Sequence, residues 1–243
     1  MAPTDSLHDL ALESVGSRIV TGEIPPGAVL TPEGLGISRT VLRECIRVLE
    51  ALGLVQARRR RGTVVQPETE WRVLDPRVIA WRLAGPDRLA ALGTLSELRL
   101  AIEPVAARLA SARATPEQCG ALTEAIVGMA ATQRAADHGE YLAYDQAFHR
   151  ILLEASGNPG FRALSKAVVE ALSGRTTHAL MPHTANPEAI RLHEEVAGAV
   201  RAGDGTRAEA AMRAIVEEAD VAVQEMARGA ITAPSSTHRA PAV

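Results

Sequence analysis

The sequence predicts a mostly α-helical protein with two domains: three helices with a small β-hairpin, followed by an all-α antiparallel helical bundle. An arginine-rich helix and hairpin between residues 36 and 66 indicate the first domain. After residue 86, six long stretches have apolar residues at helical spacing, without the alternation typical of strands, and they indicate the bundle. With 243 residues and 47% hydrophobic content, the chain can bury two cores.

A helix is expected to begin after Ser38, because a serine side chain can cap the first free amide groups of a helix. Its apolar residues follow at three- and four-residue steps: Val41, Leu42, Cys45, Leu49 and Leu52. The opposite face carries Arg39, Arg43 and Arg47, and Gly53 ends the helix. A helix with one apolar face and one arginine face fits the major groove of DNA.

The next segment predicts a β-hairpin with a basic turn. Leu54 to Ala57 and Thr63 to Gln66 favour two short strands, which are separated by four arginines and Gly62. Residues 39 to 61 include seven arginines and two glutamates, a local charge of about +5 in a chain whose net charge is -3. Such arginines neutralise phosphates, and a guanidinium can also read guanine. A solvated charged face, the alternative interpretation, requires charge, cap, hairpin and glycine to coincide by chance.

These residues resemble the winged helix-turn-helix of the GntR family of bacterial regulators. The likeness covers about residues 8 to 66 and includes Ile19 to Gly22 and Pro26 to Leu30. In that family, the start of the recognition helix and the wing tip contact bases or phosphates. The resemblance implies this role for Ser38, Arg39, Thr40, Arg43 and Gly62. We expect Arg60 and Arg61 of the basic turn to contact phosphates as well.

The resemblance has one departure. Between Leu30 and Gly36 the family usually has a full helix, and this chain is roughly four residues short there. Either the first helix of the helix-turn-helix is stunted, or a few residues have dropped out of the sequence.

The remaining chain divides into three further segments. We expect a DNA-binding domain over 1–66, a linker with one short helix over 67–86, a helical effector-binding and dimerisation domain over 87–230 and a disordered tail over 231–243. The predicted bundle helices cover about residues 87–112, 115–136, 139–156, 160–179, 187–202 and 205–228. After residue 66 the chain has eighteen basic and twenty-two acidic residues, so this part should not bind DNA.

Composition also predicts a location. No apolar run approaches the roughly 18 residues of a membrane span, and the N-terminus lacks the pattern of a signal peptide. The two cysteines, Cys45 and Cys119, suggest neither a disulfide framework nor a thiolate metal site. We therefore expect a soluble, cytoplasmic protein with no membrane partner.

Polar residues on apolar helix faces give a second clue to function. Asp145 and His149 lie four residues apart on one apolar stripe, and His193 lies on the apolar face of a later helix. One oxygen and two imidazoles suit zinc, or nickel or manganese, and leave positions open for water or a ligand. Spacing alone does not establish this site, because an Asp and a His four apart are common by chance. A lone histidine is more often a hydrogen-bonded core residue.

The chain over about residues 87 to 228 is similar to the FCD ligand-binding domain of the FadR subfamily. The likeness is carried by Arg99 to Pro104, Asp145 to His149, Glu154 to Pro159, and His193 with Ala202 to Asp204. Many members of that family bind a divalent metal through an aspartate and three histidines. The position of the last histidine corresponds here to Ile215. The resemblance thus implies either a three-ligand site with more room for an effector or no metal, and members of this kind are often similar to sugar-acid regulators.

Two arginines are candidates for binding an anionic effector. Arg99 shares a face with apolar residues, so its guanidinium should point into the bundle and meet an anion; alternatively, it pairs with Glu103 four residues on. Arg175 continues an apolar row at the end of its helix and is a second, weaker candidate. His178 and His183 are more typical of loop residues than of ligands.

Together these patterns predict a homodimeric transcription regulator. The N-terminal domain would bind a half-site of a palindromic double-stranded DNA operator, because one short recognition helix gives little specificity alone. The protein would be a repressor released by a small carboxylate, such as a sugar acid or hydroxy acid, bound at the metal. A metal-free regulator of the acyl-CoA type would need a largely apolar tunnel. A metal-dependent hydrolase would need a general base and an oxyanion donor, and we find no motif for either.

Overall fold

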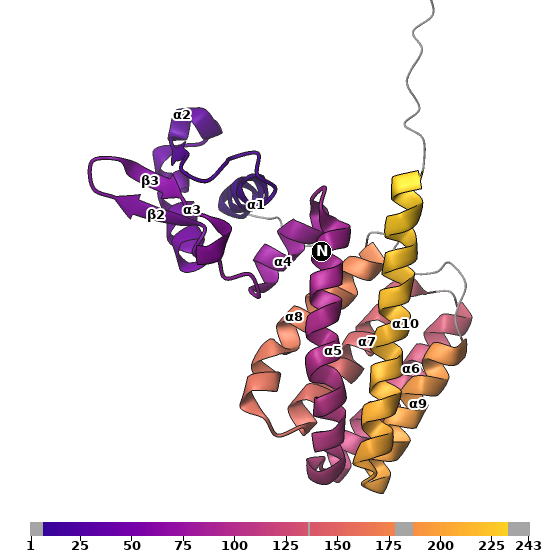
Figure 1. Cartoon of the computed structure of the whole chain (residues 1–243). Coiled ribbons are helices and arrows are strands. Elements are labelled where there is room, and N and C mark those ends of the chain that lie inside the picture. Colours follow the sequence, from indigo (N-terminus) through magenta and orange to yellow (C-terminus); the bar gives the residue numbers. More distant parts are fainter. Residues whose placement is uncertain (1–6, 136, 178–186, 233–243) are drawn as a thin grey trace, which may run out of the picture.

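The computed structural model describes residues 7–135, 137–177 and 187–232 of the chain. A small N-terminal domain with a β-sheet lies beside a bundle of long helices, and the short helix α4 (Pro76–Ala84) lies between them (Figure 1). The predicted mostly α-helical fold, with a small winged helix-turn-helix followed by a helical bundle, is therefore confirmed. Within the described residues, no helix is long and apolar enough to cross a membrane.

The N-terminal domain has three helices and a three-stranded antiparallel sheet. Its elements are α1 (Leu7–Val20), β1 (Val29–Leu30), α2 (Pro32–Leu35), α3 (Arg39–Ala51), β2 (Val55–Arg58) and β3 (Gly62–Val65). The strands have the order β1-β3-β2, and Val55 pairs with Val65 while Arg58 pairs with Gly62. The hairpin was predicted within one residue at each end. Strand β1 was not predicted, because two residues are too short to show an alternating pattern.

Helix α2 is a single turn. The side chain of Thr31 accepts a hydrogen bond from the Gly34 amide at 3.1 Å and caps the start of the helix. Gly36 ends α2 with a positive φ of 67°, a conformation that costs glycine little. In the chain as given, this segment therefore forms one short helical turn.

Apolar side chains from all parts of the N-terminal domain meet in one core. Helix α1 packs across α3, and the predicted apolar face of α3 points inwards. Cys45, Leu49 and Leu54 are fully buried there. Burial of a leucine side chain of this kind stabilises the fold by about 1.5 to 3 kcal/mol.

The C-terminal part is an all-α bundle, as predicted. Its helices are α5 (Arg88–Arg113), α6 (Pro116–Ala135), α7 (His138–Ala155), α8 (Pro159–Thr177), α9 (Pro187–Ala202) and α10 (Gly205–Thr232). A 3-10 turn, η1 (Glu68–Glu70), precedes α4. The largest difference from the prediction lies in α10, which continues to Thr232 and so enters the segment expected to be a disordered tail. Residues 233–243 of that segment lie outside the described residues.

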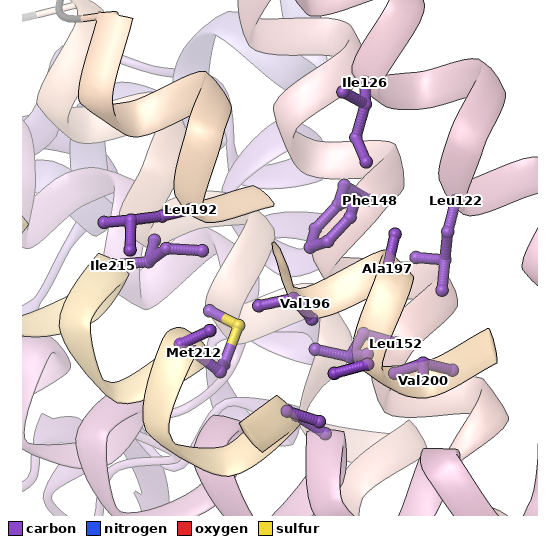
Figure 2. Close-up of a cluster of buried hydrophobic side chains, with 14 of the residues drawn as sticks. Leu122, Ile126, Phe148, Leu152, Leu192, Val196, Ala197, Val200, Met212 and Ile215 are labelled. Carbon is purple, nitrogen blue, oxygen red and sulfur yellow. The ribbon is translucent and has the colours of Figure 1, made fainter. Parts of the chain in front are cut away.

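The bundle encloses a core of aliphatic side chains around one phenylalanine. The two longest helices, α5 and α10, run side by side, and α7 packs against both α6 and α8 (Figure 1). Phe148 and Leu152 of α7 meet Val196 of α9 and Met212 of α10 in the core (Figure 2). The residues that line the candidate metal site belong to α7 and α9, so this core fixes their relative position.

Helix α4 contacts both domains. The Trp81 indole donates a hydrogen bond to Glu13 of α1 at 2.5 Å, and its ring lies so close to Gly16 that no Cβ would fit there. On the bundle side, Leu83 lies against Gly174 of α8 in the same way. The single helix α4 therefore lies in contact with both α1 and α8.

Candidate functional site

The first candidate site is the exposed face of α3. Ser38 caps this helix, because its side chain accepts a hydrogen bond from the Val41 amide at 3.2 Å. Arg39, Thr40 and Arg43 are exposed, while the opposite face is buried in the domain core. Glu44 contacts Arg43 at 3.6 Å and Arg47 at 2.9 Å. Exposed pairs of this kind contribute at most about 1 kcal/mol, so the arginines can exchange Glu44 for phosphates or bases.

The hairpin of β2 and β3, called the wing below, carries a second group of exposed cations in addition to those of α3. Residues Arg58 to Gly62 form the turn between β2 and β3, and the four arginines in it are exposed. The backbone of Arg60 has a positive φ of 64°, and Gly62 follows with 83°. A non-glycine residue in this region costs about 1 kcal/mol or more. The sequence identified Arg60, Arg61 and Gly62 as the wing tip, but it contained no signal for the conformation of Arg60.

The second candidate site is a buried cluster formed by Asp145 and His149 of α7 and His193 of α9. One ligand atom from each residue lies within 4.8 Å of the other two. The Oδ1 atom of Asp145 is 3.3 Å from Nε2 of His193 and 3.5 Å from Nε2 of His149. Neither Nε2 atom has a hydrogen-bond partner among the described residues. The structure thus brings together the three residues that the sequence suggested as ligands.

The opposite ring nitrogens explain why both Nε2 atoms are available. Nδ1 of His193 lies 2.6 Å from the carbonyl oxygen of Ala189, and Nδ1 of His149 lies 2.5 Å from a carboxylate oxygen of Glu103. Both partners can only accept, so each Nδ1 carries the proton. Each Nε2 atom then faces the carboxylate of Asp145 and has a lone pair only when its ring is neutral. A divalent metal ion fits this donor set, and binding it would give partners to both orphaned nitrogen atoms.

The charge of the cluster also favours a cation. Burial alone would raise the pKa of Asp145, but His149 and His193 outweigh it and hold that pKa well below the ordinary value. Asp145 is therefore an anion inside the bundle, where its side chain is only 10% exposed. The edge of the Phe148 ring packs against both imidazoles, with ring centroids 4.8 Å from His193 and 5.8 Å from His149.

Glu103 belongs to this site although the sequence gave it no role there. It is fully buried, and its carboxylate also accepts a hydrogen bond from Nε of Arg99 at 2.7 Å. Burial acts to raise the pKa of Glu103, but Arg99 and His149 outweigh it and lower the pKa to about 2. The sequence showed the spacing of Arg99 and Glu103, but not the contact with His149, which is 46 residues away.

The two candidate effector arginines have different surroundings. Arg99 is 2% exposed and forms the ion pair with Glu103, which is the second of the two interpretations of the sequence. Arg175, at the end of α8, has a buried Nε atom without a hydrogen-bond partner among the described residues. Burial lowers the pKa of Arg175, and Arg99 acts in the same direction, while Asp145 and Tyr141 oppose them.

The position implied for a fourth ligand carries no donor. Ile215 of α10 is 8% exposed and lies next to Leu192, which precedes His193 on α9 (Figure 2). Its side chain belongs to the aliphatic core of the bundle. His178 and His183, which the sequence suggested as loop residues, lie outside the described residues.

The geometry defines a class of protein. A winged helix-turn-helix with a basic recognition surface is joined through α4 to a helical domain that contains a buried polar cluster. This combination is that of a DNA-binding transcription regulator with a second, helical domain.

Comparisons with known proteins identify the family. Residues 11–65 match the model of the bacterial regulatory proteins of the gntR family, and residues 94–218 match the FCD domain. The chain belongs to the GntR family, in its FadR-like subfamily with an FCD domain, and is a transcription regulator rather than an enzyme. The chain is 36% identical over 211 residues to the uncharacterized regulator Rv0494 of Mycobacterium tuberculosis, covering 83% of each chain.

Further relatives extend the likeness over nearly the whole chain. The galactonate operon transcriptional repressor of Escherichia coli is 29% identical over 224 residues, which cover 90% of this chain and 97% of that protein. Among solved structures, Escherichia coli McbR/YncC superposes with a TM-score of 0.54 at 18% identity, covering 92% of this chain and 100% of that chain. At that identity, the structural likeness supports the fold only.

Proposed function

We propose that this protein is a homodimeric repressor that a small carboxylate, bound at a divalent metal ion in the helical domain, releases from its DNA operator. The observation that carries the proposal is the pair of buried, unpartnered Nε2 atoms facing the carboxylate of Asp145. Asp145, His149 and His193 would hold the ion. The ion would supply a positive charge and open coordination positions to the effector.

Zinc suits the donor set best, with nickel and manganese as alternatives. Two imidazoles and one carboxylate are ligands that zinc commonly takes, and a site with three protein ligands keeps a position open. The hydrophobic side chain of Ile215 occupies the position where relatives of this family have a further ligand. A site of this kind has more room for an effector than one with four protein ligands.

A carboxylate effector follows from the charges around the site. A divalent ion held by one carboxylate and two neutral imidazoles keeps a net positive charge. Arg175 adds a second cation with an unpartnered buried nitrogen, whereas the charge of Arg99 is balanced by Glu103. A sugar acid or hydroxy acid has both a carboxylate and a hydroxyl oxygen for the open positions of the metal. The resemblance to the galactonate operon repressor supports a sugar acid.

On the DNA side, two recognition helices would read a palindrome. We propose that the start of α3 and the wing contact the operator through Ser38, Arg39, Thr40, Arg43, Arg60, Arg61 and Gly62. Side chains of α3 would contact base edges, and the wing would contact phosphates and the minor groove. A twofold axis doubles the number of contacts and so provides the specificity that one short helix lacks.

The packing of α4 supports a route from effector to DNA. Arg175 follows Gly174, which lies against Leu83 of α4, and Trp81 of the same helix lies on Gly16 of α1. A carboxylate that draws Arg175 towards the metal displaces the end of α8 against α4. Helix α4 then carries the winged domain with it, and the two recognition helices of the dimer lose the spacing of the operator half-sites.

The experiment combines metal analysis with a ligand screen. Elemental analysis of the purified protein should find about one zinc per chain, as expected for a single site of this kind. Galactonate, lactate and an acyl-CoA are then tested for a rise in melting temperature, because a ligand that binds only the native state stabilises it. A hydroxy acid or sugar acid should raise the melting temperature and release duplex DNA in a mobility-shift assay. A protein without stoichiometric metal that responds to the acyl-CoA would contradict the proposal.

A further inference from the structure

Glu103 lies outside the three-residue donor set but connects to it directly. Its side chain is fully buried in the middle of α5, a place where an unpaired carboxylate is very costly. One carboxylate oxygen accepts from Arg99, and the other accepts from His149. The nitrogen of His149 that faces the metal position is the one that Glu103 does not contact.

The chemistry of these contacts fixes the orientation of His149. A carboxylate has no proton to donate, so Nδ1 of His149 must be the donor in the 2.5 Å contact with Glu103. In the neutral ring, Nε2 then has the lone pair that a metal ion needs. The negative charge on Glu103 also makes this lone pair a stronger donor.

The role of Arg99 follows from the same geometry. Its Nε atom lies 2.7 Å from one oxygen of Glu103, and Nη2 lies 3.5 Å from the other. The guanidinium therefore compensates the buried charge of Glu103 and prevents the carboxylate from turning towards the metal position. His193 needs no such pair, because a backbone carbonyl fixes its Nδ1.

We infer that Glu103 is a positioning residue of the metal centre, which holds His149 as an Nε2 ligand, and that Arg99 acts on Glu103 rather than on the effector. This inference rests on the proposed metal-binding function. It assigns a role to two buried residues that hold no position in the donor set. It also leaves Arg175 as the arginine that meets the effector.

The substitution Glu103→Gln tests the first part, because it keeps the size of the side chain and reverses one hydrogen bond. The amide oxygen of glutamine can still accept from Arg99, but its NH2 group must then face Nδ1 of His149. His149 would have to accept at Nδ1 and protonate Nε2, which removes the metal lone pair. Zinc affinity measured against a competing chelator should fall by about 10- to 100-fold.

The matched control is Glu154→Gln. Glu154 forms an ion pair with Arg150 at the same four-residue spacing, but both side chains are partly exposed and neither touches the cluster. Zinc affinity should stay at the wild-type level. Circular dichroism and melting temperature of the metal-free proteins show whether Glu103→Gln remains folded.

A nitrogen-15 NMR spectrum of zinc-loaded wild-type protein tests the inference without any variant. His149 should bind zinc through Nε2 and carry a proton on Nδ1, and ligation through Nδ1 would contradict the inference. If wild-type protein binds no zinc, the proposed function itself fails. If wild type binds zinc and Glu103→Gln binds it equally well, only the role of Glu103 is wrong.

The roles of Arg99 and Arg175 are distinguished by measuring the affinities of variants for zinc and for the carboxylate. Arg99→Lys should lower zinc affinity and leave the affinity for galactonate, or for another carboxylate found in the screen, unchanged at saturating zinc. Arg175→Lys should leave zinc affinity unchanged and lower the affinity for the carboxylate. A loss of carboxylate affinity in Arg99→Lys with unchanged zinc affinity would place Arg99 at the effector and overturn this assignment.

Discussion

At the scale of single residues, the candidate metal site is a cluster of two buried imidazoles and one buried carboxylate. Burial removes His149 and His193 from water, and neither Nε2 atom has a hydrogen-bond partner among the described residues. A buried polar atom without a partner costs about 1 to 3 kcal/mol. The native fold retains this cost at two atoms that face one carboxylate. A bound metal ion would remove this cost.

The substitution His149→Ala removes one of three protein ligands, and Ile215 offers nothing to replace it. Metal content should fall well below one ion per chain, and the response to the carboxylate should disappear. DNA binding should persist, because the winged domain has a core of its own. Elemental analysis and mobility shifts measure these effects. His138→Ala, at the exposed start of α7, serves as the control, and stoichiometric metal in His149→Ala would refute the ligand assignment.

The substitution Ile215→His adds a ligand instead of removing one. It places an imidazole at the position that the resemblance implies for a fourth ligand. Zinc should bind more tightly, because a further donor closes the coordination shell. The effector should bind more weakly, because the new side chain fills its coordination position. Calorimetric titrations with zinc and then with the carboxylate measure both affinities. An unchanged zinc affinity would mean that Ile215 does not face the metal.

At the scale of elements, we propose that α3 contacts base edges of the DNA and that the wing contacts phosphates. Arg43 is exposed on the face of α3 opposite the buried Cys45. Removal of its guanidinium in Arg43→Ala should cost about 1 to 3 kcal/mol per half-site if that group reads a base. A titration at fixed salt on an operator selected from random duplexes measures the change in affinity, and circular dichroism checks the fold. Wild-type affinity would show that Arg43 makes no specific contact.

The wing arginines should behave differently. Arg60→Ala and Arg61→Ala each leave one phosphate without its cation, so binding should weaken equally on operator and random DNA. The slope of log affinity against log salt should become less steep by about one for each phosphate that is no longer neutralised. The measurement is a series of titrations at increasing salt on both duplexes. A weakening confined to one base pair of the operator would identify the residue as a base reader instead.

Local patterns in the sequence predicted these elements well, and tertiary contacts account for what it missed. The cap at Ser38, the apolar face of α3 and the glycine after the hairpin act within a few residues, so the pattern contains them. The convergence of Asp145 and His149 follows from their four-residue spacing. The contact of Glu103 with His149 joins α5 to α7, and no local pattern contains it. The positive φ of Arg60 likewise depends on the geometry of the turn.

At the scale of the whole molecule, α4 packs against both the winged domain and the bundle. The helix has one large side chain on each neighbour: Trp81 on Gly16 of α1 and Leu83 on Gly174 of α8. Both contacts are close, since a Cβ at either glycine would meet the side chain of α4. Arg175 follows Gly174, so in the proposed mechanism a ligand that binds Arg175 would act where the bundle meets α4.

Binding of the carboxylate at the metal ion can be measured by calorimetric titration of one protein sample in three states: zinc-loaded, stripped by a chelator, and reloaded with zinc. The titrant is the sugar acid or hydroxy acid that gives the largest thermal shift. We expect the carboxylate to bind the loaded protein, not to bind after stripping, and to bind again after reloading. Equal affinity in the loaded and stripped states would contradict it and would leave Asp145, His149 and His193 as a polar pocket without a metal.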